Sequence, residues 1–398
     1  MKQNLIVAFG GVSPEHEVSV LTAMQAISAL ENSNYRLIPL YISKSGRWLT
    51  GDYLLDLEHY KDLDTLKSHA VPCTFSHDEN SQPVLLETEK KGLFSSPEQY
   101  PIYAVLTAFH GSEGENGGFQ GACEFYNIPY SGSGILASSV GMDKVKAKEL
   151  AQAHEIPVTD GIDFFESEWE AHQDELLEQV EALGFPVVIK PVNLGSSIGV
   201  MKASSRDDLI EAIETAFRYD ENLLLEKAVS PLMEINCSVL GTSDQNEASV
   251  CERPLGKEEL LSFEDKYQSE NGGGEKGMAS ADREIPADIS DELTQNIRAL
   301  SQKIFSVFRA SGVARLDFLV NSETGEYYFN EINTIPGSFS FYLWEESDYS
   351  ITELMLRLVD IAIERHQRKN GRIRSYETNL LNEKAVHGIK GLKGSQND

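Results

Sequence analysis

A short apolar run near the N-terminus, NLIVAF at residues 4–9, limits the possible folds of this chain more than any other segment. A continuous run of this kind predicts a strand that is covered on both faces, as in a parallel sheet. The segment GGVSPEHEVS follows it and leads into VLTAMQAISAL, in which apolar residues recur at helical spacing. A buried strand followed at once by a helix is the opening of an α/β layer, so we predict an α/β fold.

The same patterns continue along the first part of the chain. YRLIPLYIS and AVLTAF predict two more strands, and GGFQGACEFY predicts a helix. Residues from about 50 to 100 are polar and lack a regular period, so we expect surface elaboration there. Residues 1–142 are therefore predicted to form a Rossmann-like N-terminal domain.

Two smaller units are predicted to follow. Residues 143–226 carry the strand patterns FPVVIKP, GVMKA and NLLLEKAV, with a helix in SSRDDLIEAIETAF. Residues 227–370 contain a strand in EINCSVLG, a polar glycine-rich loop, a helix near 288–310, a hairpin and a helix near 349–366. The tail at 371–398 has little hydrophobic periodicity, so we expect it to be partly disordered or docked on a neighbour.

Charge and composition exclude several classes of partner. The 398 residues include 34 Lys and Arg against 63 Asp and Glu, a formal net charge of −29, which repels nucleic acid and anionic lipid. The four cysteines have neither CxxC nor Cys/His spacing, which disfavours both a zinc site and a disulfide framework. We therefore expect the protein to work in a reducing compartment. No apolar run approaches the roughly 18 residues of a membrane helix. We predict a cytoplasmic protein without nucleic-acid or membrane partners.

The hairpin VARLDFLVNSETGEYYFNEIN at residues 313–333 carries an unusual polar face. Residues two apart on a strand share a face, so Arg315 and Asp317 lie together on the first strand. The same alternation places Phe329, Glu331 and Asn333 together on the second strand, next to the first polar row. Two carboxylates and an amide oxygen are hard ligands that suit Mg²⁺ and a phosphate-bearing substrate. A solvated sheet face with an Arg–Asp pair is the alternative.

Lysines beside glycine-rich turns strengthen the prediction of a nucleotide site. Lys190 ends the apolar strand of VVIKP, and the loop after it contains Ser196 and Ser197, whose backbone amides can face phosphate oxygens. Lys144 stands in MDKVKAK at the start of a helical pattern. A snorkelling surface lysine and a solvated helix face are the alternatives for these two residues. In a chain this acidic, such lysines are more informative than usual.

Eight segments in order resemble the signature segments of the D-alanine–D-alanine ligases of the ATP-grasp superfamily. They are GGVSPEHEVS, FHGSEGENGGFQGACEFYNIPYSGSG, MDKVKAK, FPVVIKPVNLGSSIGV, LLLEKAV, EDKYQS, ARLDF and NEINTIPG. The resemblance implies a three-domain ATP-grasp architecture and an enzyme that joins two D-alanines for peptidoglycan synthesis, through a D-alanyl phosphate made with ATP. It also implies a homodimer.

The resemblance further implies a role for each matching residue. Two Mg²⁺ ions, or Mn²⁺ in their place, would be held by Asp317, Glu331 and Asn333. ATP would be bound by Lys144, Lys190, Ser196, Ser197, Glu226, Lys227, Val229, Glu234, Lys266 and Phe329. Catalysis would involve Glu15, Ser196, Tyr267, Arg315 and the backbone amide of Gly337. D-alanine would be bound by Glu15, His110, Ser338 and Tyr342.

One segment departs from the family pattern. After NTIPG the family usually has a serine that helps to bind the carboxylate of the second amino acid, whereas this chain reads SFSFYLWE and has Tyr342 at or near that place. The phenol can donate a hydrogen bond to a carboxylate, and Ser338 or Ser340 can take the serine's role. The alternative function is therefore a ligase that keeps D-alanine as donor and takes a different acceptor. An inactive nucleotide-binding protein is disfavoured, because the metal and phosphate ligands are all present.

Overall fold

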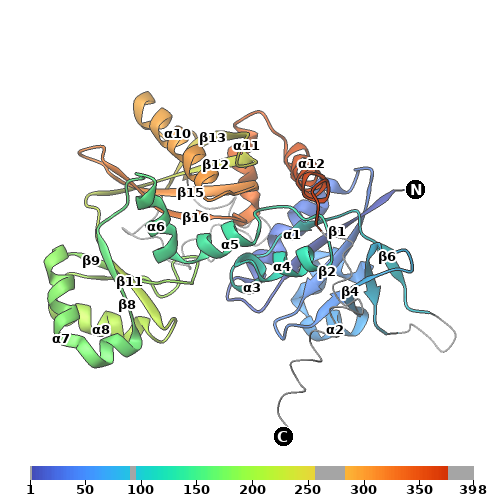
Figure 1. The fold of residues 1–398 in the computed structure, drawn as a ribbon, viewed down its shortest axis with the longest axis horizontal. Coiled ribbons are helices and arrows are strands. Elements are labelled where there is room, and N and C mark those ends of the chain that lie inside the picture. Colours follow the sequence, from blue (N-terminus) through green and yellow to red (C-terminus); the bar gives the residue numbers. More distant parts are fainter. Residues whose placement is uncertain (1, 90–95, 256–282, 375–398) are drawn as a thin grey trace, which may run out of the picture.

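The computed structural model describes residues 2–89, 96–255 and 283–374, which form three β-sheets flanked by helices (Figure 1). In the first sheet the strand order is β6-β5-β4-β3-β2-β1-β7, with β1 parallel to β2 and β7. Its strands are β1 Gln3–Gly10, β2 Tyr35–Ile42, β3 Trp48–Thr50, β4 Val71–His77, β5 Pro83–Glu87, β6 Gln99–Pro101 and β7 Ala104–Thr107. Five successive residues of β1, Leu5 to Phe9, are fully buried, as the apolar run predicted.

The prediction of surface elaboration between residues 50 and 100 is wrong. Strands β3 to β6 extend the first sheet by antiparallel pairing. In β4 only Cys73 and Phe75 turn inward, so the apolar period is too short to stand out in the sequence. Short helical segments lie between β3 and β4: η1 Asp52–Leu55, η2 Leu57–Lys61 and α2 Leu63–His69.

Helices cover this first sheet and lead to the second. Helix α1 packs on β1 and against the long helix α12 from the other end of the chain (Figure 1). The helices of this region are α1 His16–Leu30, α3 Ser112–Glu115, α4 Gly118–Phe125, α5 Ile135–Met142, α6 Lys144–Ala153 and α12 Ile351–Asn370. The break between α5 and α6 is at Asp143, whose side chain caps α6 by accepting from the Lys146 N–H. None of the helices in the described ranges is long and apolar enough to cross a membrane.

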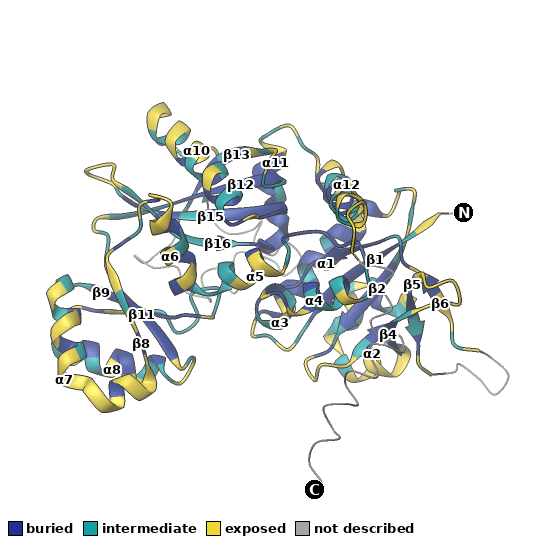
Figure 2. Ribbon diagram, in the orientation of Figure 1, coloured by how far each residue is buried: buried dark blue, intermediate teal, exposed yellow. Residues whose placement is uncertain are grey.

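The second sheet is small and antiparallel, with the order β10-β9-β11-β8. Two helices cover one of its faces and turn their outer sides to solvent (Figure 2). The elements are β8 Gly161–Phe165, α7 Glu166–Leu183, β9 Val187–Pro191, β10 Met201–Ala203, α8 Arg206–Ala216 and β11 Asn222–Lys227. The sequence predicted β9, β10, α8 and β11 but not β8 and α7, because α7 is highly charged and buries only Trp169, Leu177 and Val180.

The third sheet has the order β14-β13-β12-β15-β16. Its apolar face packs under α10 and α6, and α11 packs on β13. The elements are β12 Leu232–Gly241, β13 Asn246–Pro254, β14 Arg283–Glu284, α10 Asp291–Val307, β15 Gly312–Asn321, β16 Tyr327–Asn333, the 3-10 turn Gly337–Ser340 and α11 Phe341–Glu345. We keep the predicted domain division at residues 142 and 226 as a proposal.

The hairpin β15–β16 contains a β-bulge that corrects one prediction. Asp317 pairs with Glu331, but the next pair is Phe318 with Phe329, so Asn330 is an extra residue in β16. The bulge inverts the alternation, and Phe329 is fully buried in the apolar core with Phe318. The prediction that Phe329 shares the face of Glu331 and Asn333 is therefore wrong, and its contact with adenine stays a prediction.

Candidate active site

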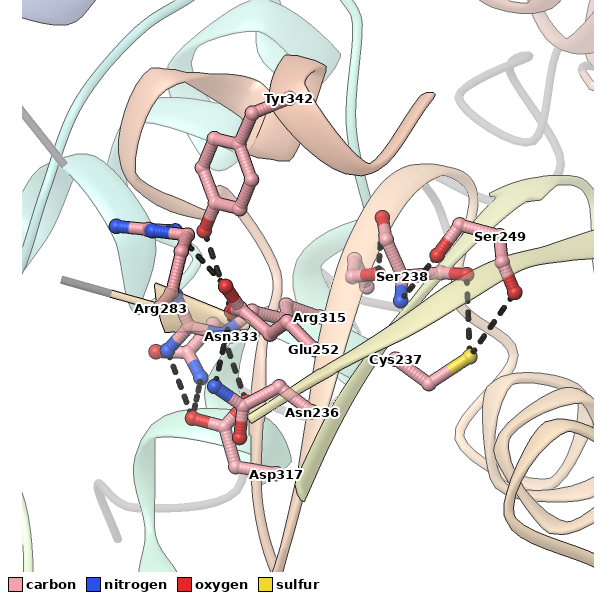
Figure 3. A network of polar contacts seen from close by, with 11 residues as sticks. Asn236, Cys237, Ser238, Ser249, Glu252, Arg283, Arg315, Asp317, Asn333 and Tyr342 are labelled. Atoms are coloured by element: carbon pink, nitrogen blue, oxygen red, sulfur yellow. Dashed lines mark hydrogen bonds and ion pairs between the residues drawn. The ribbon is translucent and has the colours of Figure 1, made fainter. Parts of the chain in front are cut away.

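A row of polar residues crosses four strands of the third sheet. The strand register pairs Glu252 with Asn236, Asn236 with Asp317, and Asp317 with Glu331. Directly opposed residues share a face of the sheet, so these side chains form one line across β13, β12, β15 and β16. Figure 3 shows Asn236, Glu252 and Asp317 close together, with one set of contacts around Glu252 and another around Asp317. The predicted meeting of the two polar rows of the hairpin is confirmed.

Asp317 is the centre of the hairpin end of this row. Arg315 binds it through two hydrogen bonds of 2.7 Å, from Nε to Oδ1 and from Nη2 to Oδ2. Asn333 Nδ2 adds a third bond, 3.0 Å from Asp317 Oδ2. Burial alone would lower the pKa of Arg315, but the adjacent Asp317 carboxylate raises it well above its ordinary value. The guanidinium therefore stays charged at the edge of the pocket described below.

The donor chemistry of this face fits Mg²⁺. Asp317 and Glu331 supply carboxylates and Asn333 supplies an amide oxygen, which is the small set of protein oxygens that Mg²⁺ takes when phosphate completes its shell. Within the described residues no three His, Cys, Asp or Glu side chains are placed to hold a metal ion by themselves. A metal here would therefore need the Asn333 amide and phosphate oxygens as well as the two carboxylates.

A pocket opens where the three sheets meet, and predicted residues from all three parts of the chain line it. These are Glu15, His110, Lys144, Ser196, Arg315, Glu331, Asn333 and Gly337. Gly195 of the glycine-rich loop also lines it, and the lining residues that the sequence analysis did not single out are Glu115, Gly141, Met142, Leu194, Ile332 and Ile335. Residues separated by more than 300 positions are thus brought around one cavity.

Glu15 and Ser196 meet across this pocket. Glu15 is the residue before α1, and Ser196 Oγ donates a hydrogen bond to its carboxylate. A Cβ placed on Gly195 would lie 2.9 Å from Glu15 Oε2, so a side chain at this position would displace the Glu15 carboxylate. Ser196 and Ser197 have positive φ angles of 52° and 58°, a conformation that non-glycine residues seldom adopt. Strained backbone of this kind is concentrated at ligand-binding loops.

His110 is buried beside the pocket and held in one orientation. Thr22 Oγ1 lies 2.8 Å from His110 Nε2, and the ring also makes a backbone hydrogen bond with Ile335. Burial, together with the nearby Arg315 charge, lowers the pKa of His110 to about 3. The imidazole is therefore neutral at physiological pH and acts as a hydrogen-bonding group rather than as a cation.

Glu115 is a buried carboxylate that sequence reasoning missed. Its Oε2 accepts from the Gly111 N–H at 2.9 Å, and its Oε1 accepts from the Ile335 N–H at 3.2 Å. Burial, helped by the Glu15 charge, raises its pKa to about 7. It joins the loop after β7 to the segment after β16 at the floor of the pocket. The segment HGSEGEN contains two acidic residues, Glu113 and Glu115, and only the fold distinguishes Glu115 from its neighbour.

A buried cluster of opposite charges lies beside the pocket. Lys190 Nζ is 2.6 Å from Glu226 Oε2, and Lys148 makes an ion pair with the other oxygen of Glu226. Burial alone would raise the pKa of Glu226, but the two lysines lower it to about 2. Lys190 also donates to Asn330 Oδ1 at 2.8 Å, which connects the second sheet to the bulge of β16. The cluster therefore has two cations for one anion, a net positive charge suited to phosphate.

Lys144 and Lys148 explain the spacing in MDKVKAK. They are four residues apart on α6, so both point to the same side of the helix. The Lys144 ammonium donates to the Leu194 carbonyl at the start of the glycine-rich loop, and burial lowers its pKa. Sequence analysis selected Lys144 and missed Lys148, although the i, i+4 spacing was a usable signal.

The structure does not bring Tyr342 to the pocket. Its hydroxyl donates to Glu252 Oε1 at 3.3 Å, and the Arg283 guanidinium lies 4.0 Å from the centre of its ring (Figure 3). Arg283 also pairs with Glu252 at 2.8 Å, so the phenol belongs to the buried end of the polar row. Ser338 is buried as well, and its backbone N–H donates to Thr22 Oγ1 at 3.1 Å.

The remaining predicted residues have varied positions. Lys227 is exposed, and its N–H is used in a bond to the Asp160 carbonyl at 2.9 Å. Val229 is partly buried just beyond β11. Glu234 lies on β12 two residues before Asn236, on the face of the polar row. Lys266 and Tyr267 lie outside the described residues, and so does the tail from residue 375 on.

Comparison with known families agrees with this geometry. Residues 4–133 match the family described as "D-ala D-ala ligase N-terminus" and residues 150–360 match "D-ala D-ala ligase C-terminus". A D-alanine--D-alanine ligase of Thermosipho melanesiensis is 37% identical over 378 residues, which cover 95% of this chain and 98% of the relative. The chain belongs to the D-alanine–D-alanine ligase family. A family member from Bacillus licheniformis is 34% identical over 93% of this chain and 98% of its own length.

Solved structures of the D-alanine–D-alanine ligase family share the architecture, so the expected ATP-grasp fold is confirmed. The ligase of Coxiella burnetii has a TM-score of 0.77 at 27% identity, covering 98% of this chain and all of that one. The VanG D-Ala:D-Ser ligase of Enterococcus faecalis has a TM-score of 0.75 at 26% identity, covering 91% of this chain and 100% of that one. Since the relatives of higher identity are D-alanine--D-alanine ligases, the comparisons do not favour the alternative of a different acceptor drawn from SFSFYLWE.

Proposed function

We propose that this chain joins two molecules of D-alanine into D-alanyl-D-alanine, with ATP converted to ADP and phosphate. The observation that carries the proposal is the convergence of Glu15, Ser196, Arg315 and Glu331 on one pocket next to the buried lysine cluster. An α-amino acid needs a carboxylate for its ammonium group, and its activated carboxyl needs cations and N–H donors around it. The pocket offers both within the family that carries this activity.

The proposed reaction has two steps. A carboxylate oxygen of the first D-alanine attacks the γ-phosphorus of ATP, which releases ADP and leaves D-alanyl phosphate. The amine of the second D-alanine, having lost a proton, then attacks the acyl carbon, and phosphate leaves with the bonding electrons. Phosphoryl transfer of this type depends mainly on positioning and charge neutralisation.

Each group has a proposed part in those steps. Glu15 holds the ammonium group of the first D-alanine and is itself held by Ser196. Arg315 and the Gly337 amide stabilise the oxyanion that forms at the acyl carbon. Lys144 and Lys190 bind phosphates, and the neutral His110 donates or accepts a hydrogen bond at the substrate.

Magnesium has a proposed place on the same face. Asp317, Glu331 and Asn333 would hold two ions, which would neutralise the phosphate oxygens during transfer. ATP binding by Ser197, Glu226, Lys227, Val229 and Glu234 is likewise proposed from the family resemblance. A cytoplasmic location and a homodimer stay predictions, and light scattering checks the second of them.

The test is direct. Purified protein is incubated with ATP, Mg²⁺ and D-alanine, phosphate release is measured, and the product is identified by mass spectrometry. We expect D-alanyl-D-alanine in equal amount to phosphate, and none with L-alanine. Phosphate release without the dipeptide, or no turnover at all, contradicts the proposal.

A further inference from the structure

Thr22 on α1 connects two distant parts of the pocket through one hydroxyl group. Its side chain is buried, with 1% exposure. The hydroxyl oxygen lies 3.1 Å from the backbone nitrogen of Ser338, 316 residues along the chain, and 2.8 Å from His110 Nε2. Both contacts are in the buried interior between the first and third sheets. The site prediction from the sequence did not include this residue.

The direction of these hydrogen bonds follows from the groups themselves. A backbone N–H can only donate, so Thr22 Oγ1 accepts from Ser338. The threonine has one proton left to donate, and His110 Nε2 is the acceptor within reach. A neutral imidazole has one ring proton, and the backbone hydrogen bond with Ile335 takes it, which leaves Nε2 unprotonated and able to accept from Thr22. The Thr22 hydroxyl thus stabilises the tautomer that Ile335 favours.

The segment bonded to Thr22 has an unusual backbone. Ser338, Phe339 and Ser340 all have left-handed φ angles, of 53°, 53° and 49°. Side chains disfavour this conformation, and single residues adopt it far more often than consecutive ones. The turn therefore needs fixed contacts to persist. The bond to Thr22 ties the first of these residues to α1.

Gly337 precedes this turn and lines the pocket. Its amide is a proposed oxyanion donor, and a donor of this kind works only when it is aimed at one place. Movement of Ser338 would turn the adjacent peptide and move that N–H. The same hydroxyl that orients His110 therefore also limits the motion of the Gly337 amide.

We propose that Thr22 is a positioning residue, whose hydroxyl stabilises the His110 tautomer that is unprotonated at Nε2 and holds the Gly337 amide in place. This inference rests on the proposed ligase function for its kinetic consequence but not for its structural one. A buried threonine with a merely structural role would behave like Thr50, which is also 1% exposed and donates to the Pro39 carbonyl at 2.7 Å in the first sheet.

Three variants distinguish a positioning role of Thr22 from a merely structural role. Thr22→Val has nearly the same shape but no hydroxyl, Thr22→Ser keeps the hydroxyl, and Thr50→Val loses a comparable hydrogen bond away from the pocket. We expect Thr22→Val to lower kcat by roughly 10- to 100-fold, the size of loss that follows from misplaced reacting groups. KM for ATP should not change, because the lysine cluster is untouched. Thr22→Ser and Thr50→Val should retain the kcat of the unaltered protein.

A second measurement does not depend on activity. Long-range ¹H–¹⁵N spectra report the tautomer of each histidine, and His110→Gln assigns the signal. We expect the His110 Nε2 shift to move in Thr22→Val and to stay in Thr22→Ser and Thr50→Val. If Thr22→Val does not fold, Thr22→Ala replaces it in both measurements.

The outcomes are distinct. An unchanged kcat in Thr22→Val, an equal loss in Thr22→Ser, or an unmoved His110 signal in Thr22→Val overturns the proposal. If the unaltered protein has no ligase activity, the proposed function fails, and the histidine spectra alone then decide whether Thr22 positions His110.

Discussion

Removing Lys148 should destabilise the protein through Glu226. The carboxylate is 2% exposed and the Lys148 side chain 7%, so water does little to replace a lost partner. The pKa of Glu226 falls from 4.5 to about 2 even though burial acts in the opposite direction. At about 1.4 kcal/mol for each unit, the two lysines together favour the ionised form by at least ~3 kcal/mol.

Lys148 contributes more of this attraction than Lys190 does. We therefore expect Lys148→Met to lower the free energy of unfolding by about 2–4 kcal/mol, and Glu226→Gln by about 3–5 kcal/mol, the usual cost of leaving a buried charge unpaired. The double variant should lose at least ~2 kcal/mol less than the sum of the two single losses, because the interaction can be lost only once.

The assay is urea unfolding of the four proteins, with midpoint and slope both fitted. The matched control is Lys146→Met, because Lys146 is on the same helix, is exposed and pairs with Glu149 at 2.8 Å. An exposed pair should change the free energy of unfolding by less than about 1 kcal/mol. A coupling energy below about 0.5 kcal/mol between Lys148 and Glu226 would refute the reasoning.

Four further predictions follow from the structure. Asp317→Asn should lower kcat by roughly 100-fold or more, measured as phosphate release, and an unchanged kcat would contradict its metal role. Chelation by EDTA should abolish turnover and added Mg²⁺ should restore it; turnover that persists without metal argues against the site. Because the pKa of Glu115 is raised to about 7, the folded state binds more protons than the unfolded state above pH 4.5, so stability should fall as pH rises from 4.5 to 7. Melting curves recorded across this pH range should show a weaker fall in stability for Glu115→Gln than for the unaltered protein. An identical fall in both proteins would count against the raised pKa of Glu115. Gly10→Ala should lower the free energy of unfolding by more than ~2 kcal/mol in melting experiments, because the new Cβ would lie 2.2 Å from the Ile42 carbonyl oxygen. The control is Gly184→Ala, whose Cβ would meet nothing within 4 Å, and a comparable loss in that variant would refute the steric argument.

Local patterns in the sequence predicted the elements that have a clear period. The apolar run at residues 4–9 is a buried strand with a parallel neighbour on each side, and the alternation Arg315–Asp317 defines a polar face. The ordered motifs indicated the family, whereas the i, i+4 spacing of Lys144 and Lys148 on α6 was a local signal that the prediction did not use. These features depend on neighbours a few residues apart, so the sequence contains them directly.

The tertiary structure decided which distant groups meet. Nothing in the sequence places Thr22 between His110 and Ser338, and nothing pairs Lys148 with Glu226. The bulge at Asn330 is a property of strand register, which local alternation does not determine, and it moved Phe329 to the opposite face. Pairing and packing between separate segments set these contacts, because the free energy of each depends on partners far along the chain rather than on the local residues.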